Sequence, residues 1–407
     1  MYRMQKFATL TAPPAARTSL ASVLIIGALL AGGTVRAAAQ TGPGLQLSLG
    51  GIPVVAFKAG RDGCDGHDVP DAPLRAFRDT AGATVAFGLH FVNRRLRGPS
   101  IDRLKIDCKV VLTSGHNGDP TRYNDYNWIT ATWTNDGKTI AALVHHEYHG
   151  NEHAGRCAYK TMMQCWMNTI TTWRSADSGA SFQRNRTGFV AAAAPFRQTM
   201  HQGRHRGFFN PSNIVASGRY KYFMASQTGW SGQKYGVCLF RSADPSRPGS
   251  WRAWDGARFT IAYRDPYASK ANVKPLRACK PVAPFPAPVG AIVRHRPSGL
   301  WLAVFQAAAD KRYFPLPGIY FATGVSLTRW SAPRLLIAGK TLYDDPCTSG
   351  GQIISYPSLL DPQAKGRNYD DAGNSAYLFY ALMKVKGCTI TSQRDLVRIR
   401  VNIRKVR

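Results

Sequence analysis

The chain has 407 residues, of which 53 are Lys or Arg and 23 are Asp or Glu, so its formal net charge is +30. Hydrophobic residues make up 44% of the chain and aromatic residues 11%, a composition that excludes an intrinsically disordered protein. The positive charge is larger than solubility requires, and it indicates an anionic partner.

The N-terminal segment has the parts of a secretory signal peptide. Basic residues precede an apolar stretch from Leu20 to Leu30, and three consecutive alanines end at Ala39. The apolar stretch is well short of the roughly 20 residues that a membrane-spanning helix needs. We therefore expect residues 1–39 to be a cleaved signal peptide and residues 40–407 to form one domain. The mature protein is expected to be secreted or periplasmic, with no transmembrane segment.

The eight cysteines all lie beyond the expected cleavage site. An even number of cysteines in an exported chain favours disulfides over metal thiolates. Local geometry favours a bond between Cys157 and Cys165. It also favours a bond between Cys347 and Cys388, whereas the pairing of the other four cysteines is left open.

Short segments rich in aromatic and β-branched residues recur between turns that contain Gly, Pro, Asn or Asp. In chain order they include TVAFGLHFV, TIAALVHHEY, YKYFMAS, LWLAVFQ and AYLFYALM. Helical periodicity is scarce. The pattern predicts an all-β protein.

A repeated unit of a short strand, a turn and an aromatic second strand begins at five places. These starts are Asp71, Asp125, Asn210, Gly290 and Pro357. A further aromatic strand follows each copy, so the repeats predict a five-bladed β-propeller of four-stranded blades. The irregular spacing of the starts indicates loops of different lengths. A two-sheet β-sandwich is the alternative.

One turn carries a resemblance to known propellers. The segment SADSGASF, from Ser175 to Phe182, resembles the Asp-box turn S-x-D-x-G-x-x-[W/F] of sialidases. We expect Asp177 to cap its own turn, with no part in catalysis. Over residues 60–407, the strand units resemble the five-bladed propeller glycosidases, which include arabinanases, xylosidases and fructan hydrolases. They also resemble a set of uncharacterised secreted sialidase-like proteins.

This resemblance implies a funnel lined by carboxylates from the first strands of the blades. The base would be an Asp of the first blade, a second Asp would tune pKa values, and a Glu of the third blade would be the acid. Asp71 and Asp125 stand at the first two positions. Asn210 stands at the third, so the acid has to come from elsewhere.

The chain has two glutamates, Glu147 and Glu152, and both lie in the segment HHEYHGNEH. A glycosidase needs one protonated and one ionised carboxyl group on the two sides of the scissile bond. We therefore predict a glycoside hydrolase in which Glu147 is the acid, with a raised pKa, and Asp71 is the base. Asp125 would be the third catalytic carboxylate. Alternatively, the two aspartates open turns and Glu147 forms a salt bridge.

The same segment contains four of the ten histidines. If the strand continues through it, His145, Glu147 and His149 project from one face. His146 and Tyr148 then project from the other. Two imidazoles and a carboxylate can bind a metal, but the spacing is not that of the H-E-x-x-H motif. We therefore expect hydrogen bonds to a hydroxylated ligand and no cofactor or catalytic metal, and we leave open a structural calcium or other divalent ion.

Basic, polar and aromatic side chains complete the expected site. The candidate substrate-binding residues are Arg75, His145, His146, Tyr148, Asn210, Trp128 and Tyr356. Aromatic rings among them can stack on sugars. Because exported proteins meet acidic glycans more often than genomes, the positive charge favours an anionic poly- or oligosaccharide as the partner, and nucleic acid is not expected.

Two other functions remain open at this point. A polysaccharide lyase would use Tyr148 or His146 as its base. Arg75 or Arg78 would then neutralise the carboxylate of a uronate. A glycan-binding propeller without catalysis would explain why Asn210 stands where the resemblance places an acid. The sugar, the anomeric outcome and the oligomeric state are also open.

Overall fold

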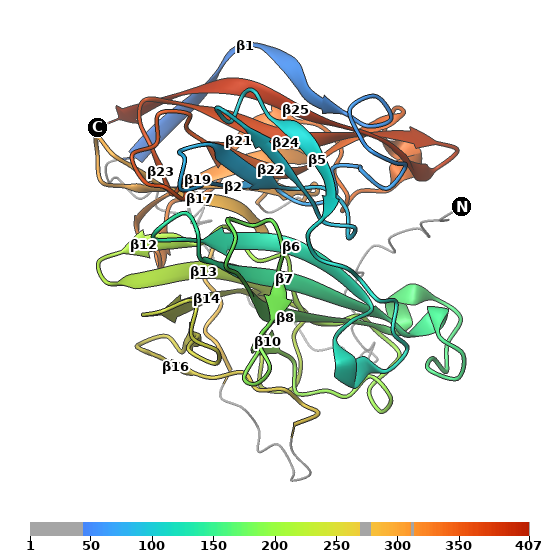
Figure 1. Ribbon diagram of the computed structural model, residues 1–407. Coiled ribbons are helices and arrows are strands. Elements are labelled where there is room, and N and C mark those ends of the chain that lie inside the picture. The colour runs from blue at the N-terminus through green and yellow to red at the C-terminus, as the bar shows by residue number, and fades with distance from the viewer. Residues whose placement is uncertain (1–43, 269–277, 311–312, 407) are drawn as a thin grey trace, which may run out of the picture.

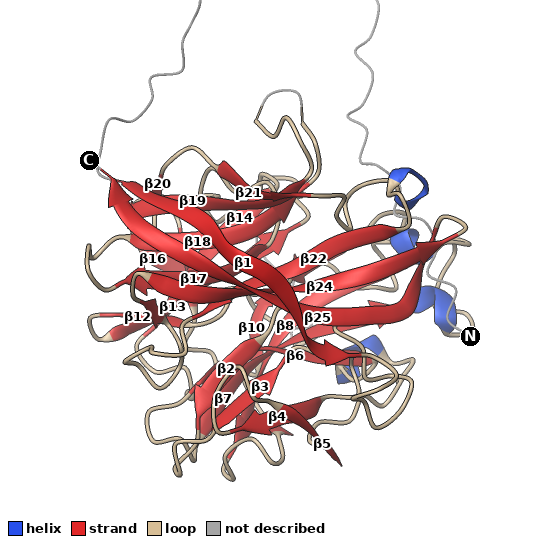
Figure 2. Ribbon diagram, turned by 90° about the horizontal axis from the view of Figure 1, so that it is seen from above, coloured by secondary structure: helices blue, strands red, loops and turns tan. Residues whose placement is uncertain are grey.

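The computed structural model describes residues 44–268, 278–310 and 313–406. Within these residues the chain forms 25 strands and four short 3-10 helices, so the all-β prediction is confirmed. The helices gather on one side of the molecule (Figure 2). The expected signal peptide lies outside the described residues.

The strands form four sheets. The first sheet contains β2 (Arg75–Arg78), β3 (Thr84–Phe87), β4 (Arg94–Gly98) and β5 (Lys105–Val110). The second contains β6 (Tyr126–Trp133), β7 (Ile140–His149), β8 (Trp166–Ser175), β9 (Gln183–Arg184), β10 (Val190–Ala193), β11 (Arg206–Phe209), β12 (Val215–Ser217), β13 (Tyr220–Gln227), β14 (Gly236–Ser242), β15 (Arg252–Trp254) and β16 (Phe259–Ile261).

The third sheet contains β17 (Val289–His295), β18 (Trp301–Ala307), β19 (Gly318–Ser326), β20 (Arg329–Trp330), β21 (Arg334–Ala338) and β23 (Asp371–Ala372). The fourth contains β1 (Gly44–Lys58), β22 (Gln352–Leu360), β24 (Ser375–Lys386) and β25 (Thr389–Val406). The 3-10 helices are η1 (Pro120–Arg122), η2 (Gly150–Glu152), η3 (Met162–Gln164) and η4 (Pro346–Thr348).

The second sheet joins two of the five predicted units. Its halves are linked by β8 and β11, which pair in parallel with Arg206 opposite Met167. Gly207 permits this contact, because a Cβ atom at that position would lie 1.9 Å from the backbone oxygen of Asn168. Because β8 and β11 join two predicted units in one sheet, the strands form four sheets. The division of the chain into five separate blades remains a prediction.

The first and last described strands pair with each other. β1 runs antiparallel to β25, from Gly44 opposite Val406 to Lys58 opposite Asp395. Figure 1 shows β1 (blue) lying along β25 (red). In the C-terminal segment RIRVNIRKV, Ile399, Val401 and Ile403 alternate with polar residues and are buried in one core cluster with Leu45 and Leu47. This basic run is therefore a half-buried strand.

Arg75 lies inside the protein and not at its surface. The residue as a whole is 2% exposed. Its guanidinium donates hydrogen bonds to the backbone oxygens of Thr130 (2.6 Å), Pro211 (3.0 Å) and Gly290 (2.6 Å). These acceptors belong to three further predicted units. Burial lowers the pKa of Arg75 to about 9, so it stays charged at neutral pH. Arg75 therefore stabilises the packing between units. Because its guanidinium is buried among backbone oxygens, the predicted substrate-binding role does not fit its position.

An interior cavity next to this arginine is lined by residues that include Leu74, Thr132 and Asn213. None of the candidate catalytic carboxylates lines it. The cavity therefore belongs to the packing around Arg75 and is separate from the candidate site.

The four disulfides include both expected pairs. Cys157 is bonded to Cys165 and Cys347 to Cys388, as predicted. The other bonds are Cys64–Cys108 and Cys238–Cys279. Four disulfides are consistent with an oxidising, extracellular environment. In the part of the chain that the structure describes, no helix has the length and apolar character needed to cross a bilayer.

Asp177 caps its own turn, as expected. One of its carboxylate oxygens accepts hydrogen bonds from the hydroxyl of Ser175 (2.7 Å) and the backbone N–H of Ser181 (3.0 Å). The left-handed residues Ser178 and Gly179 complete the turn. Its role is structural, and these contacts do not by themselves relate the chain to sialidases.

Candidate functional site

Three alternate residues of β7 form the centre of the candidate site. The Nε2 atom of His149 lies 2.9 Å from one carboxylate oxygen of Glu147, and the Nε2 atom of His145 lies 3.7 Å from the other. The predicted alternation of faces is therefore confirmed. The Glu147 side chain is 15% exposed, so it reaches solvent while both histidines are buried.

His149 bridges the two glutamates. Its Nδ1 atom lies 3.2 Å from Glu152 of η2, and the hydroxyl of Tyr126 donates to the other oxygen of Glu152 at 2.8 Å. Burial alone would lower the pKa of His149, but its hydrogen bonds to both carboxylates and their charges raise it to about 9. The imidazole is therefore protonated at neutral pH.

The pKa of Glu147 moves in the direction opposite to the prediction. Burial raises it, but the hydrogen bond from His149 and the charges of the neighbouring histidines outweigh burial and hold it below the ordinary value. The proton shared by Glu147 and His149 is therefore on His149 at neutral pH. A proton donated by Glu147 would have to be drawn from that imidazolium.

We expect the ring of His149 to titrate near pH 9 in the folded protein. Since folding raises this pKa, the stability contributed by its ion pairs is fully present below the unfolded-state pKa of about 6.5. That stability is lost as the pH rises through about 9. Histidine ring ¹⁵N shifts measured against pH test this, with Glu152→Gln lowering the midpoint because one partner is removed. A His149 midpoint near 6.5 in the wild type would contradict the assignment.

Asp71 provides the second carboxylate of the site. It precedes β2, and its side chain forms an ion pair with Arg394 of β25. The hydroxyl of Tyr356 donates to the same oxygen at 3.4 Å, and the other oxygen of Asp71 lies 3.4 Å from the Nε2 atom of His90. Tyr356 has a positive φ of 55° within β22. Two of the predicted residues, Asp71 and Tyr356, therefore meet.

The carboxylates of Asp71 and Glu147 both influence the same three side chains. The charges of both carboxylates affect the pKa values of His90, His145 and Tyr356. Burial, the largest cause, lowers the pKa values of the two histidines, so both rings are neutral at neutral pH. Asp71 and Glu147 therefore belong to one site, which combines the carboxylates of Asp71, Glu147 and Glu152 with two cations and neutral imidazoles.

The next strands add polar and aromatic groups. The side-chain amide of Asn168 in β8 lies 2.8 Å from the Nε2 atom of His145, and it also contacts His205. Asn210, which has a positive φ of 47°, forms a side-chain hydrogen bond with His145. His205 stacks on Trp166 with the ring centres 4.0 Å apart. The predicted residue Asn210 thus joins the site.

Several polar atoms at the site have no partner among the described residues. These atoms are His90 Nδ1, Trp128 Nε1 and Trp166 Nε1. The ring of Trp128 lies 5.8 Å from that of His90 and 6.1 Å from that of His145. Because buried polar atoms are nearly always hydrogen-bonded, these atoms favour a ligand that carries several hydroxyl groups.

The predicted third carboxylate lies elsewhere. Since Tyr126 pairs with Glu147 and shares its face, Asp125 points to the opposite face of the sheet. There its backbone N–H donates to His146, and the hydroxyl of Tyr148 donates to Gly118. Asp125, His146 and Tyr148 therefore do not line the site with Glu147, which corrects their predicted roles.

Sequence reasoning missed several residues of the site. These are His90, Glu152, Trp166, Asn168, His205 and Arg394. Glu152 stands out in the sequence only as one of two glutamates, and His205 lies in the polar, basic segment HQGRHR, whose composition alone does not mark a site. Arg394 is 323 residues from Asp71 in the chain. No local pattern could have paired Arg394 with Asp71.

No protein-family model and no curated protein sequence matches the chain. Solved structures that resemble it include glycoside hydrolases. The catalytic domain of an α-L-arabinofuranosidase from Coprinopsis cinerea is 10% identical, with a TM-score of 0.47, over 88% of this chain and 97% of that chain. An α-L-arabinanase from Cellvibrio cellulosa, solved with arabinohexaose, is 12% identical, with a TM-score of 0.42, over 81% and 90%.

A protein of unknown function from Dyadobacter fermentans is 9% identical, with a TM-score of 0.46, over 89% of this chain and 100% of that chain. Identities and TM-scores this low do not identify the family or the activity of this chain. The chemistry of the site has to be argued from its own residues.

Proposed function

We propose that the chain is an exported glycoside hydrolase whose catalytic carboxyl groups are Asp71 and Glu147. The observation that carries the proposal is that the ring of Trp128 lies 5.8 Å from that of His90, which contacts Asp71, and 6.1 Å from that of His145, which lies beside Glu147. We further propose that the five repeated units are the blades of a single propeller domain. In this arrangement, the site lies where the first, second, third and fifth blades meet.

Asp71 is suited to be the base. A carboxylate can take a proton from an attacking water molecule, and the ion pair with Arg394 holds the Asp71 side chain in place. Hydrolysis then forms a bond between the anomeric carbon and the water oxygen and breaks the bond to the leaving oxygen. Asp71 receives the proton of the water.

Glu147 and His149 together are suited to be the acid. The pair shares one proton, which rests on His149 before reaction. Glu147 takes this proton from the imidazolium and passes it to the leaving oxygen, so that His149 ends neutral and Glu147 ends ionised. Trp128 and Trp166, whose indole N–H groups lack partners, are placed to bind sugar hydroxyls.

The net charge of +30 supports an acidic saccharide, since long-range attraction raises the rate at which anions reach a cationic protein. The signal-like N-terminus and the four disulfides support export. The site itself has carboxylates and cations in similar numbers, so the support for an anionic ligand comes from the surface.

A saccharide-binding protein without catalysis is the second candidate. It is favoured by the low pKa of Glu147, because a carboxylate that stays ionised can accept hydrogen bonds from sugar hydroxyls but cannot act as an acid. A polysaccharide lyase is the third candidate. Its unsaturated products would distinguish it from the other two.

The test is turnover by purified residues 40–407 on neutral and acidic polysaccharides. New reducing ends without unsaturated uronates are the expected result. Unsaturated uronates, detected by their absorbance, would replace the hydrolase with a lyase. Tight binding to a saccharide with neither product would leave only the binding protein.

A further inference from the structure

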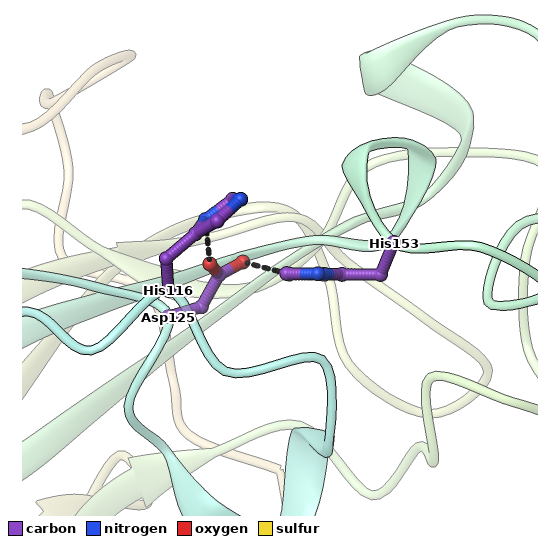
Figure 3. A group of neighbouring side chains, drawn as sticks. All are labelled: His116, Asp125 and His153. Carbon is purple, nitrogen blue, oxygen red and sulfur yellow. Dashed lines mark hydrogen bonds and ion pairs between the residues drawn. The ribbon is translucent and has the colours of Figure 1, made fainter.

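A second group of ligating side chains lies on the opposite face of β6 and β7 from Glu147. His116, Asp125 and His153 converge there, with their ligating atoms all within 4.8 Å of one another (Figure 3). Asp125 lies between the two histidines. One of its oxygens is 2.9 Å from His116 Nδ1, and the other is 3.1 Å from His153 Nε2. The three residues come from the loop before η1, the start of β6 and the residue after η2.

One ring nitrogen of this group has no hydrogen-bond partner in the part of the chain that the structure describes. The side chain of Asp125 is fully buried, whereas that of His153 is 10% exposed. The Nε2 atom of His153 nevertheless has no hydrogen-bond partner among the described residues, because it lies close to the carboxylate but is not aligned for a hydrogen bond to it. His116 is held at a positive φ of 44°. The buried ring nitrogen therefore keeps unused ligating capacity beside a buried carboxylate, an arrangement that a cation bound by both groups would satisfy.

The surrounding residues hold the ligands in place. The backbone N–H of His149 donates to Asp125 at 2.8 Å, and the ring of Tyr148 stacks on that of His153 at an angle of 23°. The hydroxyl of Tyr148 donates to Gly118, whose Cβ position would lie 3.2 Å from His153 Nδ1. Such contacts from a second layer orient metal ligands and fix which ring nitrogen faces the ion.

We propose that His116, Asp125 and His153 bind a divalent first-row transition metal ion, with Zn²⁺ as the best match. Two imidazoles and one carboxylate are a common ligand set for Zn²⁺, whereas Ca²⁺ and Mg²⁺ prefer sites made of oxygen atoms. The side chain of His116 is 51% exposed, so the fourth coordination position faces solvent and is available to water. This site differs from the triad of His145, Glu147 and His149.

The ion would connect the segment after η2 to the start of β6. Glu152, which hydrogen-bonds to His149, directly precedes His153. Binding of the ion therefore fixes the position of Glu152 relative to His149, and we expect it to raise the melting temperature. This effect does not depend on the chemistry proposed for Asp71 and Glu147.

The experiment is calorimetric titration of the chelator-treated protein with Zn²⁺. We expect one equivalent to bind, and binding to weaken at least tenfold in both His116→Ala and His153→Ala. The control is His67→Ala, which removes an exposed histidine outside the group and should leave the affinity unchanged. Because His116 is exposed, its replacement should not prevent folding, and thermal melts of each variant check this.

Co²⁺ provides a second readout of the same site. Strong visible absorption bands of a four-coordinate Co²⁺ ion, lost in His116→Ala, would support the proposal. The proposal fails if Zn²⁺ does not bind in a defined ratio, or if both alanine variants bind it as the wild type does. It also fails if binding is lost only when His145 or His149 is replaced, because the ion would then occupy the other triad.

Discussion

Glu147→Gln should lower the rate of saccharide hydrolysis about 1,000-fold, because general acid catalysis contributes roughly a hundred- to ten-thousandfold. The amide keeps the size of the side chain and its place in β7, but it cannot pass a proton from His149 to a leaving oxygen. The variant should still bind the saccharide. Initial rates, measured with a titration of ligand binding to the same preparations, separate these two effects.

Asp71→Asn should lower the rate of saccharide hydrolysis by a similar factor, because the amide cannot act as the base. A matched control is Asp119→Asn, since Asp119 is an exposed aspartate that caps η1. We expect this control to hydrolyse at the wild-type rate. Substrates with a leaving group that needs no protonation should restore much of the rate of Glu147→Gln and none of the rate of Asp71→Asn. Equal rates in the wild type and Glu147→Gln would refute its role as acid.

Arg75→Met should destabilise the folded protein by about 3 kcal/mol or more, because each stranded backbone carbonyl costs about 1–3 kcal/mol. Methionine fills much of the same space but leaves the oxygens of Thr130, Pro211 and Gly290 without a donor. These oxygens belong to three different strands or strand ends, so the loss affects the packing between units. Denaturant unfolding with the disulfides intact measures the change.

Arg75→Lys should be intermediate in stability. It keeps the positive charge, but one ammonium group cannot reproduce the planar fork that reaches three acceptors. The control is Arg103→Met at an exposed arginine, where we expect a change within about 0.5 kcal/mol. If Arg75→Met unfolds at the same denaturant concentration as that control, the interior contacts of Arg75 contribute little.

Local patterns predicted the parts of the fold that depend on neighbouring residues. The all-β character followed from short aromatic strands, and the shared face of His145 and Glu147 followed from strand alternation. The same alternation could not place Asp125, because its face depends on the pairing of Tyr126 with Glu147. The register between two strands is set by packing and is not visible in either strand alone.

Contacts between distant segments were beyond local prediction. Arg75 has the sequence context of a surface or site residue, and only the approach of three other strands surrounds it with carbonyl groups. Arg394 stands between Gln393 and Asp395, a polar context typical of an exposed segment, yet its side chain is 4% exposed and ion-paired with Asp71. In both cases, the partners are supplied by tertiary structure.

The pairing of β1 with β25 also has a consequence for the order in which the protein is made. Gly44 is synthesised long before its partner Val406, so this strand pair closes a loop that contains all the other described strands. Until β25 has been synthesised, β1 has no neighbour in its sheet and β24 has an open edge. The first described strand must therefore wait for the last described strand before it can pair.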